Sequence, residues 1–352
     1  ELVFRSLSKV KNEEQITNES NHVTSHTGNS HGQNIKTRLE HAKDNGPSIA
    51  ILRALENLGA HVSDYANDIM NLFHRQHLHK DLRIAAVKAI VGMQIEEVQY
   101  AGMKSKLILF LRDRLQDTDA KIRTIALDVI SKSLGNAAIR YDKFFSRAIH
   151  DVNKEVRRCG LKSLGRLGHA AGRRFSVQVA HALEDQEDDI KHIASETMIK
   201  IEPNENAAPL FIKRFSHTNA NTRLASLAAF VAIFGQRLKH CARKHTIHIV
   251  PLWSDANVNI RRLSIQFTHD HLCGDILEPY NDAMMNMVCD EDMLAQTTAV
   301  QVLRKSPNLR FAEKYMDRVA ALIEDGDAPV RAAVIEALGS LHRFAVQHRE
   351  NL

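Results

Sequence analysis

The sequence predicts an all-α fold built from one repeated helix pair, and three observations lead to that expectation. Ala, Leu, Ile, Arg and Asp recur through the 352 residues, whereas aromatic residues make up only 5% and glycines number 15. This composition favours helices over a β-sandwich or barrel. One motif of polar and apolar residues returns at spacings of 32 to 40 residues. A repeat of that length is typical of stacked helix pairs that share one continuous core.

The clearest unit is residues 325–341, which read Asp-Gly-Asp-Ala-Pro-Val-Arg-Ala-Ala-Val-Ile-Glu-Ala-Leu-Gly-Ser-Leu. The other units align with it on Arg331, and seven of the nine aligned residues are basic. We call these the ladder residues. They are Ser48, Arg83, Arg123, Arg157, Lys191, Arg223, Arg261, Gln296 and Arg331.

The positions around the ladder residues predict a turn followed by an amphipathic helix. Six residues before the ladder residue, six of the nine units carry Asp. Four residues before it, short polar or acidic residues suit a helix N-cap, where they accept hydrogen bonds from free backbone N–H groups. Seven residues after it, every unit except the one with Thr268 is apolar, which predicts the buried stripe of a helix.

The form Asp-x-Asp-x-x-Val-Arg-x-x-Ala-x-x-Ala-Leu resembles the HEAT repeat, over roughly residues 37–343 and about nine units. This resemblance implies a right-handed, armadillo-like α-solenoid superhelix in which helix A, an acidic turn and helix B alternate. In that family the turn Asp and the helix-B Arg bridge adjacent repeats. The implied bridges pair Asp117, Asp151, Asp185, Asp255, Asp290 and Asp325 with Arg123, Arg157, Lys191, Arg261 and Arg331. Junctions at Ser48, His217 and Gln296 depart from the pattern and are expected to be less regular.

Two domains are expected, a polar and flexible N-terminal segment at residues 1–36 and a HEAT-like solenoid at residues 37–352. The first segment has almost no large apolar residues after its opening stretch, so it cannot offset the entropy of ordering. At the other end, residues 331–341 keep full repeat character and no clear polar cap follows. Because solenoids need capping repeats, we expect the chain to be part of a longer protein or to dock another subunit there.

A cytoplasmic protein without a membrane span is expected. The four cysteines form no CxxC pair and lie within helical patterns, which favours reduced thiols. No apolar run reaches the roughly 18 residues that a membrane span needs. The sequence begins at Glu1 without a Met, which leaves open the removal of a targeting segment.

No catalytic residue, metal ligand or cofactor is expected. The histidine clusters at residues 74–81 and 240–248 have partial zinc-ligand character, but exposed helix and turn histidines explain them better. The His-Glu dipeptide that serves as a ligand in HEAT-like iron hydroxylases is absent. Trp253 invites comparison with the base-stacking aromatics of HEAT-like DNA glycosylases, yet its place just before Asp255 favours packing. Phosphate-binding loops and nucleophile elbows are also absent.

The predicted function is that of a non-enzymatic scaffold or adaptor that binds a protein partner, within a larger complex. Its concave face is expected to hold an acidic or extended partner segment through cations on helix B. These cations are Lys88, Lys132, Lys162, Arg166, Lys200, Arg304 and Lys305.

Two alternatives remain open. The same cations would suit the backbone of a nucleic acid, although the net charge of +5 is thinly spread. Residues 52–59 and 82–90 faintly resemble the helical domain of large secreted lipid-transfer proteins, which would make the chain part of a lipid-carrying assembly.

Overall fold

The structure is a computed structural model that describes residues 45–56, 65–74, 78–92, 101–237, 244–272, 274–305 and 309–348. Within these ranges every regular element is a helix, which confirms the predicted all-α class. The chain divides into two compact units, residues 1–167 and 168–352. The predicted N-terminal segment, residues 1–36, lies outside the described residues.

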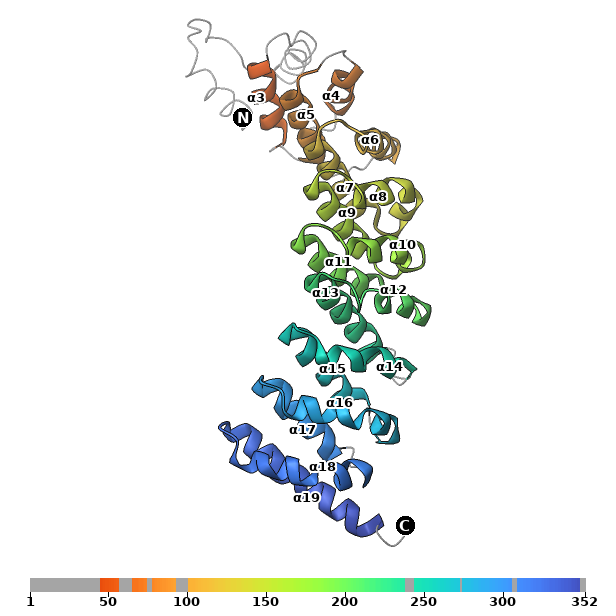
Figure 1. The fold of residues 1–352 in the computed structure, drawn as a ribbon. Helices are drawn as coiled ribbons and strands as arrows, with labels where there is room; N and C mark the ends of the chain where they lie inside the picture. The colour runs from red at the N-terminus through yellow and green to blue at the C-terminus, as the bar shows by residue number, and fades with distance from the viewer. Residues whose placement is uncertain are drawn as a thin grey trace, which may run out of the picture. The chain divides into compact units, whose positions relative to one another are not determined.

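The first unit contains two layers of helices, shown in Figure 1. Helices α3, α5, α7 and α9 pack side by side as the helix-B layer, and α4, α6 and α8 pack against it as the helix-A layer. The bounds are α3 (Asn45–Glu56), α4 (Ala66–Asn71), α5 (Lys80–Gly92), α6 (Ala101–Arg114), α7 (Ala120–Leu134), α8 (Asp142–Ile149) and α9 (Lys154–Leu167). Short 3₁₀ segments occupy Leu72–His74 and Gly135–Tyr141.

The second unit repeats this alternation, with odd-numbered helices from α11 to α19 in the helix-B layer. The bounds are α10 (His169–Ala182), α11 (Asp188–Ile201), α12 (Ala208–Ile212), α13 (Ala220–Phe230), α14 (Thr246–Ile249), α15 (Val258–His271), α16 (Asn281–Val288), α17 (Met293–Lys305), α18 (Leu309–Ala321) and α19 (Ala328–His348). The 3₁₀ segments are Glu205–Ala207, Val250–Ser254, Gly274–Tyr280 and Leu322–Glu324, and Val231–Arg237 is a π-helix.

The predicted apolar stripe forms the core between the two layers. Three residues after the ladder residue, a small side chain is fully buried in repeat after repeat, which lets neighbouring helices approach closely. Examples are Ala86, Ala126, Ala194, Ser226, Ser264 and Ala299. Gly172 on α10 serves the same purpose, because a Cβ there would lie 2.2 Å from the carbonyl oxygen of Ile201 at the end of α11.

The predicted N-caps are present at several helix-B starts. Asp119 accepts hydrogen bonds from the backbone N–H groups of Lys121 and Ile122, at 2.8 and 3.3 Å. Asn219 and Asn257 cap α13 and α15 in the same way. Each such cap contributes about 1 kcal/mol to helix stability, and together they fix where helix B begins relative to its turn.

A cluster of phenylalanines fills the core where α13 passes into the π-helix. The rings of Phe230 and Phe234 stack with centroids 4.6 Å apart. Phe215, Phe267 and Phe211 surround Phe230 at 5.5, 5.8 and 6.3 Å. Such aromatic pairs add about 0.5–1.5 kcal/mol each beyond the area they bury, so this cluster anchors α13 to its neighbours.

Candidate interaction surface

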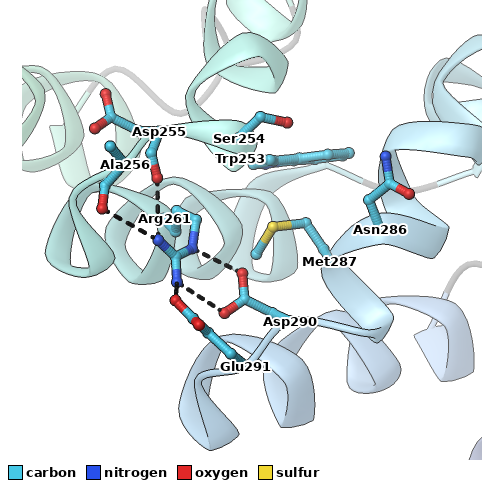
Figure 2. A pocket seen from close by; sticks show the side chains of 9 residues that line it. All are labelled: Trp253, Ser254, Asp255, Ala256, Arg261, Asn286, Met287, Asp290 and Glu291. Atoms are coloured by element: carbon cyan, nitrogen blue, oxygen red, sulfur yellow. Dashed lines mark hydrogen bonds and ion pairs between the residues drawn. The ribbon is translucent and has the colours of Figure 1, made fainter.

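The ladder residues Arg123, Arg223 and Arg261 each join two consecutive turns, and Arg261 shows the geometry most completely (Figure 2). Its Nη1 donates to the backbone oxygens of Asp255 and Ala256 in its own turn, at 3.1 and 3.4 Å. Its Nε and Nη2 donate to the two carboxylate oxygens of Asp290 in the next turn, at 2.7 and 3.0 Å. A planar guanidinium suits this use because it offers donors in two directions at once.

The same bridge recurs at other junctions. Arg123 binds both carboxylate oxygens of Asp151 at 2.8 and 2.9 Å, which together with Arg261 confirms part of the predicted pairing. The prediction left out Arg83 and Arg223, yet Arg83 binds Asp117 at 2.7 Å and Arg223 binds Asp255 at 2.6 and 2.8 Å. The bridge needs only an Asp in the following turn, so an arginine qualifies even where its own turn lacks one.

The junction around His217 is built differently. Lys191 does not bridge to the next turn as predicted, because that turn has His217 at the position where other turns have Asp. Its amine instead binds Asp188 at 2.6 Å, and Asp188 also accepts from the side-chain amide of Asn221 at 2.7 Å. His217 still serves its own turn, since its Nδ1 accepts the backbone N–H of Asn219 at 3.0 Å. The expected irregularity is present here.

The junction at Gln296 keeps the regular pattern with a neutral donor. Its side-chain amide nitrogen donates to the Asp325 carboxylate at 3.1 Å. The expectation of an irregular junction is therefore wrong at this position, because an amide N–H can replace one of the two guanidinium donors. Ser48, the third departure, has no described side chain. Arg331 contacts only its own turn within the described part of the chain, so its predicted bridge to a turn Asp is also wrong.

The structure has a surface pocket of about 480 Å³ at one of these junctions (Figure 2). Trp253, Asp255 and Arg261 line one side, and Met287 and Asp290 line the other. The Trp253 side chain is 1% exposed, which fits the predicted packing role, although its indole N–H has no hydrogen-bond partner. The charged groups of the pocket already bind one another, so the pocket is a feature of the joint rather than an open binding site.

Asp255 and Asp292 have lowered pKa values, and this predicts acid sensitivity. Burial alone would raise the pKa of Asp255, but the Arg223 guanidinium and the Asn257 N–H outweigh it and hold the pKa low. The Arg262 guanidinium lowers the pKa of Asp292 to about 2. A lowered folded-state pKa adds stability above the unfolded pKa of about 3.9. That stability is lost as the pH falls through the folded pKa.

We therefore expect the urea midpoint of the second unit to drop between about pH 4 and pH 2, measured by the fluorescence of Trp253, the single tryptophan. Asp292→Asn should flatten part of that drop, by about 1 kcal/mol or less after solvent screening. A midpoint that stays constant between about pH 4 and pH 2 would contradict this assignment.

The seven predicted cations all lie in the C-terminal halves of helix-B elements, but they are not one uniform patch. Lys88, Lys132, Lys162 and Arg166 belong to the first unit, on α5, α7 and α9. Lys200, Arg304 and Lys305 belong to the second unit, on α11 and α17.

Most of these cations already contact groups of the chain itself. In the first unit Asp128 pairs with both Lys132 and Arg166, each at 2.8 Å. Within the described residues, Lys88 and Lys162 make no ion pair or hydrogen bond. Sequence spacing could not reveal the role of Asp128, because its pair with Arg166 connects neighbouring helices and depends on their lateral offset.

The second-unit cations are likewise engaged. Lys200 lies 3.8 Å from Glu196, Arg304 pairs with Glu336, and Lys305 donates to the backbone oxygen of His269 at 3.4 Å. Glu196, Asp270 and Glu336 stand among the helix-B positions of this unit, so its charges balance. The basic excess therefore lies in the first unit.

The predicted absence of metal and catalytic chemistry concerns residues that the structure describes only in part. His77, His240 and Cys241 lie outside the described residues, as does the His74 side chain. Among the described residues no group of three or more His, Cys, Asp or Glu side chains is arranged to hold a metal ion. Burial raises the pKa of the Cys159 thiol to about 11, so this thiol is protonated at neutral pH and is a poor nucleophile.

No protein-family model matches the sequence, and no curated protein matches it either. Solved structures share the fold. Kap95p with RanGDP aligns with 91% of this chain and 46% of its own, at 13% identity and a TM-score of 0.60. Importin beta aligns with 87% of this chain and 46% of its own, at 14% identity and a TM-score of 0.60.

Kap121p bound to Pho4p aligns with 95% of this chain and 40% of its own, at 13% identity and a TM-score of 0.60. The chain thus spans less than half the length of these proteins. At such identities the likeness concerns the fold alone, and it confirms the predicted HEAT-type α-solenoid. No helix in the described residues is long and apolar enough to cross a membrane.

Proposed function

We propose that the chain is a non-enzymatic protein-interaction scaffold, part of a larger complex, that holds an acidic, extended partner segment on the helix-B face of its first unit. One observation carries the proposal. The C-terminal halves of α5, α7 and α9 carry the cations Lys88, Lys132, Lys162 and Arg166 but only one carboxylate, Asp128, which pairs with Lys132 and Arg166. Helix-B faces of solenoids form extended concave binding surfaces, and a basic lining attracts acidic segments.

Lys162 and Lys88 are the cations most available to a partner. Asp128 is shared between two cations, so its single charge cannot neutralise both. Lys162 is exposed, lies one helical turn from Arg166 on α9, and has no ion pair among the described residues. A partner carboxylate placed between Lys162 and Arg166 would gain from both, whereas each exposed pair alone is worth only about 0.2–1 kcal/mol. Several such pairs along an extended segment are therefore needed for useful affinity.

Solved structures of the same fold support a protein partner over a nucleic acid. Kap121p is bound to Pho4p in one structure, and Kap95 forms a complex with Nup1 in another. Pho4p and Nup1 are partners of Kap121p and Kap95, and this chain is only 12–13% identical to Kap121p and Kap95. What carries over to the proposal is the capacity of such a helical array to hold a second polypeptide.

The test is a charge reversal, Lys162→Glu, in the full chain. We expect partners with acidic segments to fall about five- to tenfold in quantitative affinity purification, since about 1–1.4 kcal/mol of binding energy is lost. Lys143→Glu is the matched control, because Lys143 is an exposed lysine on helix A of the same unit, at the start of α8. It makes the same change of charge away from the helix-B face.

Two results would overturn the proposal. Equal recovery of all partners from the wild type and Lys162→Glu would remove the helix-B face as the binding surface. Recovery that depends on intact nucleic acid and falls steeply with salt would replace the protein partner with a phosphate backbone.

A further inference from the structure

Lys88 and Lys162 stand at the same place in two different repeats of the first unit. Each lies five residues after its ladder arginine, Lys88 on α5 and Lys162 on α9. The helix between them, α7, carries Asp128 at this position. Lys162 is exposed and Lys88 is half-buried, and neither has an ion pair among the described residues. Two lysines of the same repeat position are therefore available to one partner, with a carboxylate between them.

The three helices that carry these residues lie side by side in nearly the same register. Arg83 at the start of α5 binds Asp117 in the turn before α7 at 2.7 Å. Between α7 and α9, the Cys159 thiol lies 3.4 Å from the backbone oxygen of Thr124, and these two residues stand two and one positions after their ladder arginines. Because the axes of packed helices lie about 8–10 Å apart, equivalent residues on α5 and α9 are separated by about 16–20 Å.

The carboxylate between the two lysines is already bound on one side. Asp128 pairs with Lys132 and Arg166, each at 2.8 Å. Both of these cations stand nine residues after their ladder arginines, one helical turn further along than Asp128. An acidic partner residue over α5 or α9 therefore meets a lysine, whereas one over α7 at the same level meets a carboxylate. The favoured acidic residues of a partner are two repeats apart.

We infer that the partner is an extended segment with two acidic residues six positions apart and no acidic residue midway between them. It rests on the proposed function, since it specifies the segment that the same face would hold. Six residues span about 19 Å in a polyproline II helix and about 20 Å in a β-strand. In both conformations residues six apart point to the same side, because six is a multiple of the repeats of three and two residues.

An α-helical partner fits this surface less well. Its rise of about 1.5 Å per residue would place the two acidic residues about 11 positions apart. The axis of a packed helix also lies about 8–10 Å from the axis beneath it. An extended backbone can lie closer, so its short acidic side chains can reach the half-buried Lys88.

The test uses rigid peptides that differ only in the spacing of their charges. Two Glu residues are placed either six or three positions apart in the same polyproline host, whose three residues per turn keep both pairs on one side. NMR titration of the full chain, labelled at its lysine amides and kept at low salt, measures both dissociation constants. We expect the six-residue spacing to bind about two- to fivefold more tightly, with the Lys88 and Lys162 signals shifting together.

Variants of single lysines make this readout specific. Lys162→Ala should bring the two peptides to equal affinity, because only one lysine of the pair remains. Lys143→Ala, on the helix-A side of the same unit, should keep the preference for the six-residue spacing.

The possible failures are distinguishable. Equal affinity of both peptides for the wild type would overturn the spacing and leave the proposed acidic partner in place. No binding of either peptide would overturn the spacing and the acidic partner together. Tighter binding of an α-helical peptide with Glu residues about 11 positions apart would overturn the extended conformation.

Discussion

Arg261→Ala is expected to lower the free energy of unfolding of the second unit by about 3–5 kcal/mol, as removal of one partner of a buried ion pair does elsewhere. The side chains of Arg261 and Asp290 are 10% and 8% exposed. Loss of the guanidinium leaves the Asp290 carboxylate with the backbone N–H of Asp292 but no opposite charge on its other side. Two turn carbonyls, those of Asp255 and Ala256, lose their donor as well.

The adjacent residue provides the control for this prediction. Arg262 also binds a turn carboxylate, that of Asp292, at 2.5 and 2.8 Å, but its side chain is 42% exposed. Arg262→Ala should therefore cost far less stability than Arg261→Ala, because solvent screens an exposed pair. Urea unfolding followed by Trp253 fluorescence measures both, because Trp253 lies in the same junction. Equal costs for the two variants would show that burial does not set the strength of these bridges.

The positions of the N-caps, turn aspartates and ladder residues could be predicted from the sequence because these residues lie close together in each repeat. Each N-cap, turn Asp and ladder residue lies within about two helical turns of the others, and the capping residues and apolar stripe follow from propensity and period alone. The bridge to the next repeat was implied by the family resemblance rather than by the spacing. That is why Arg83 and Arg223 were missed, although each has the needed Asp in the following turn.

The interaction surface could be predicted only as a set of positions. Lys162 and Arg166 are cations on successive turns of α9, yet Arg166 is bound to Asp128 and Ser131 of α7 while Lys162 makes no ion pair among the described residues. Which of them meets Asp128 depends on how far α9 is shifted along α7. That shift is set by side-chain packing across the layer, which a single sequence does not specify.

Two isoleucines show the same limit for apolar residues. Ile335 and Ile265 stand at the same position of their repeats and are identical in type. One is 58% exposed and the other fully buried. This difference in exposure comes from the neighbouring helix pair, and the residue type does not indicate it. Function in a repeat array therefore has to be sought where equivalent positions have different surroundings.

Phe230→Ala is expected to have the other large effect, a loss of about 3–5 kcal/mol in the stability of the second unit. Phe230 is fully buried and its ring meets four other phenylalanine rings, so the truncation opens a cavity that no single neighbour can fill. Val177→Ala on α10 is the control, since Val177 is 51% exposed and its truncation should cost less than about 0.5 kcal/mol.

His245 gives this prediction a second readout that a general loss of stability would not produce. Burial lowers the pKa of His245, helped by His248 and Lys244, and its ring packs against Phe230 at 5.5 Å. A cavity that admits water at Phe230 removes part of that burial, so the pKa of His245 should rise towards its ordinary value of about 6.5. NMR titration of the folded variant measures this shift. An unchanged His245 pKa together with a large stability loss would mean that the cluster collapses around the missing ring and keeps α13 in place.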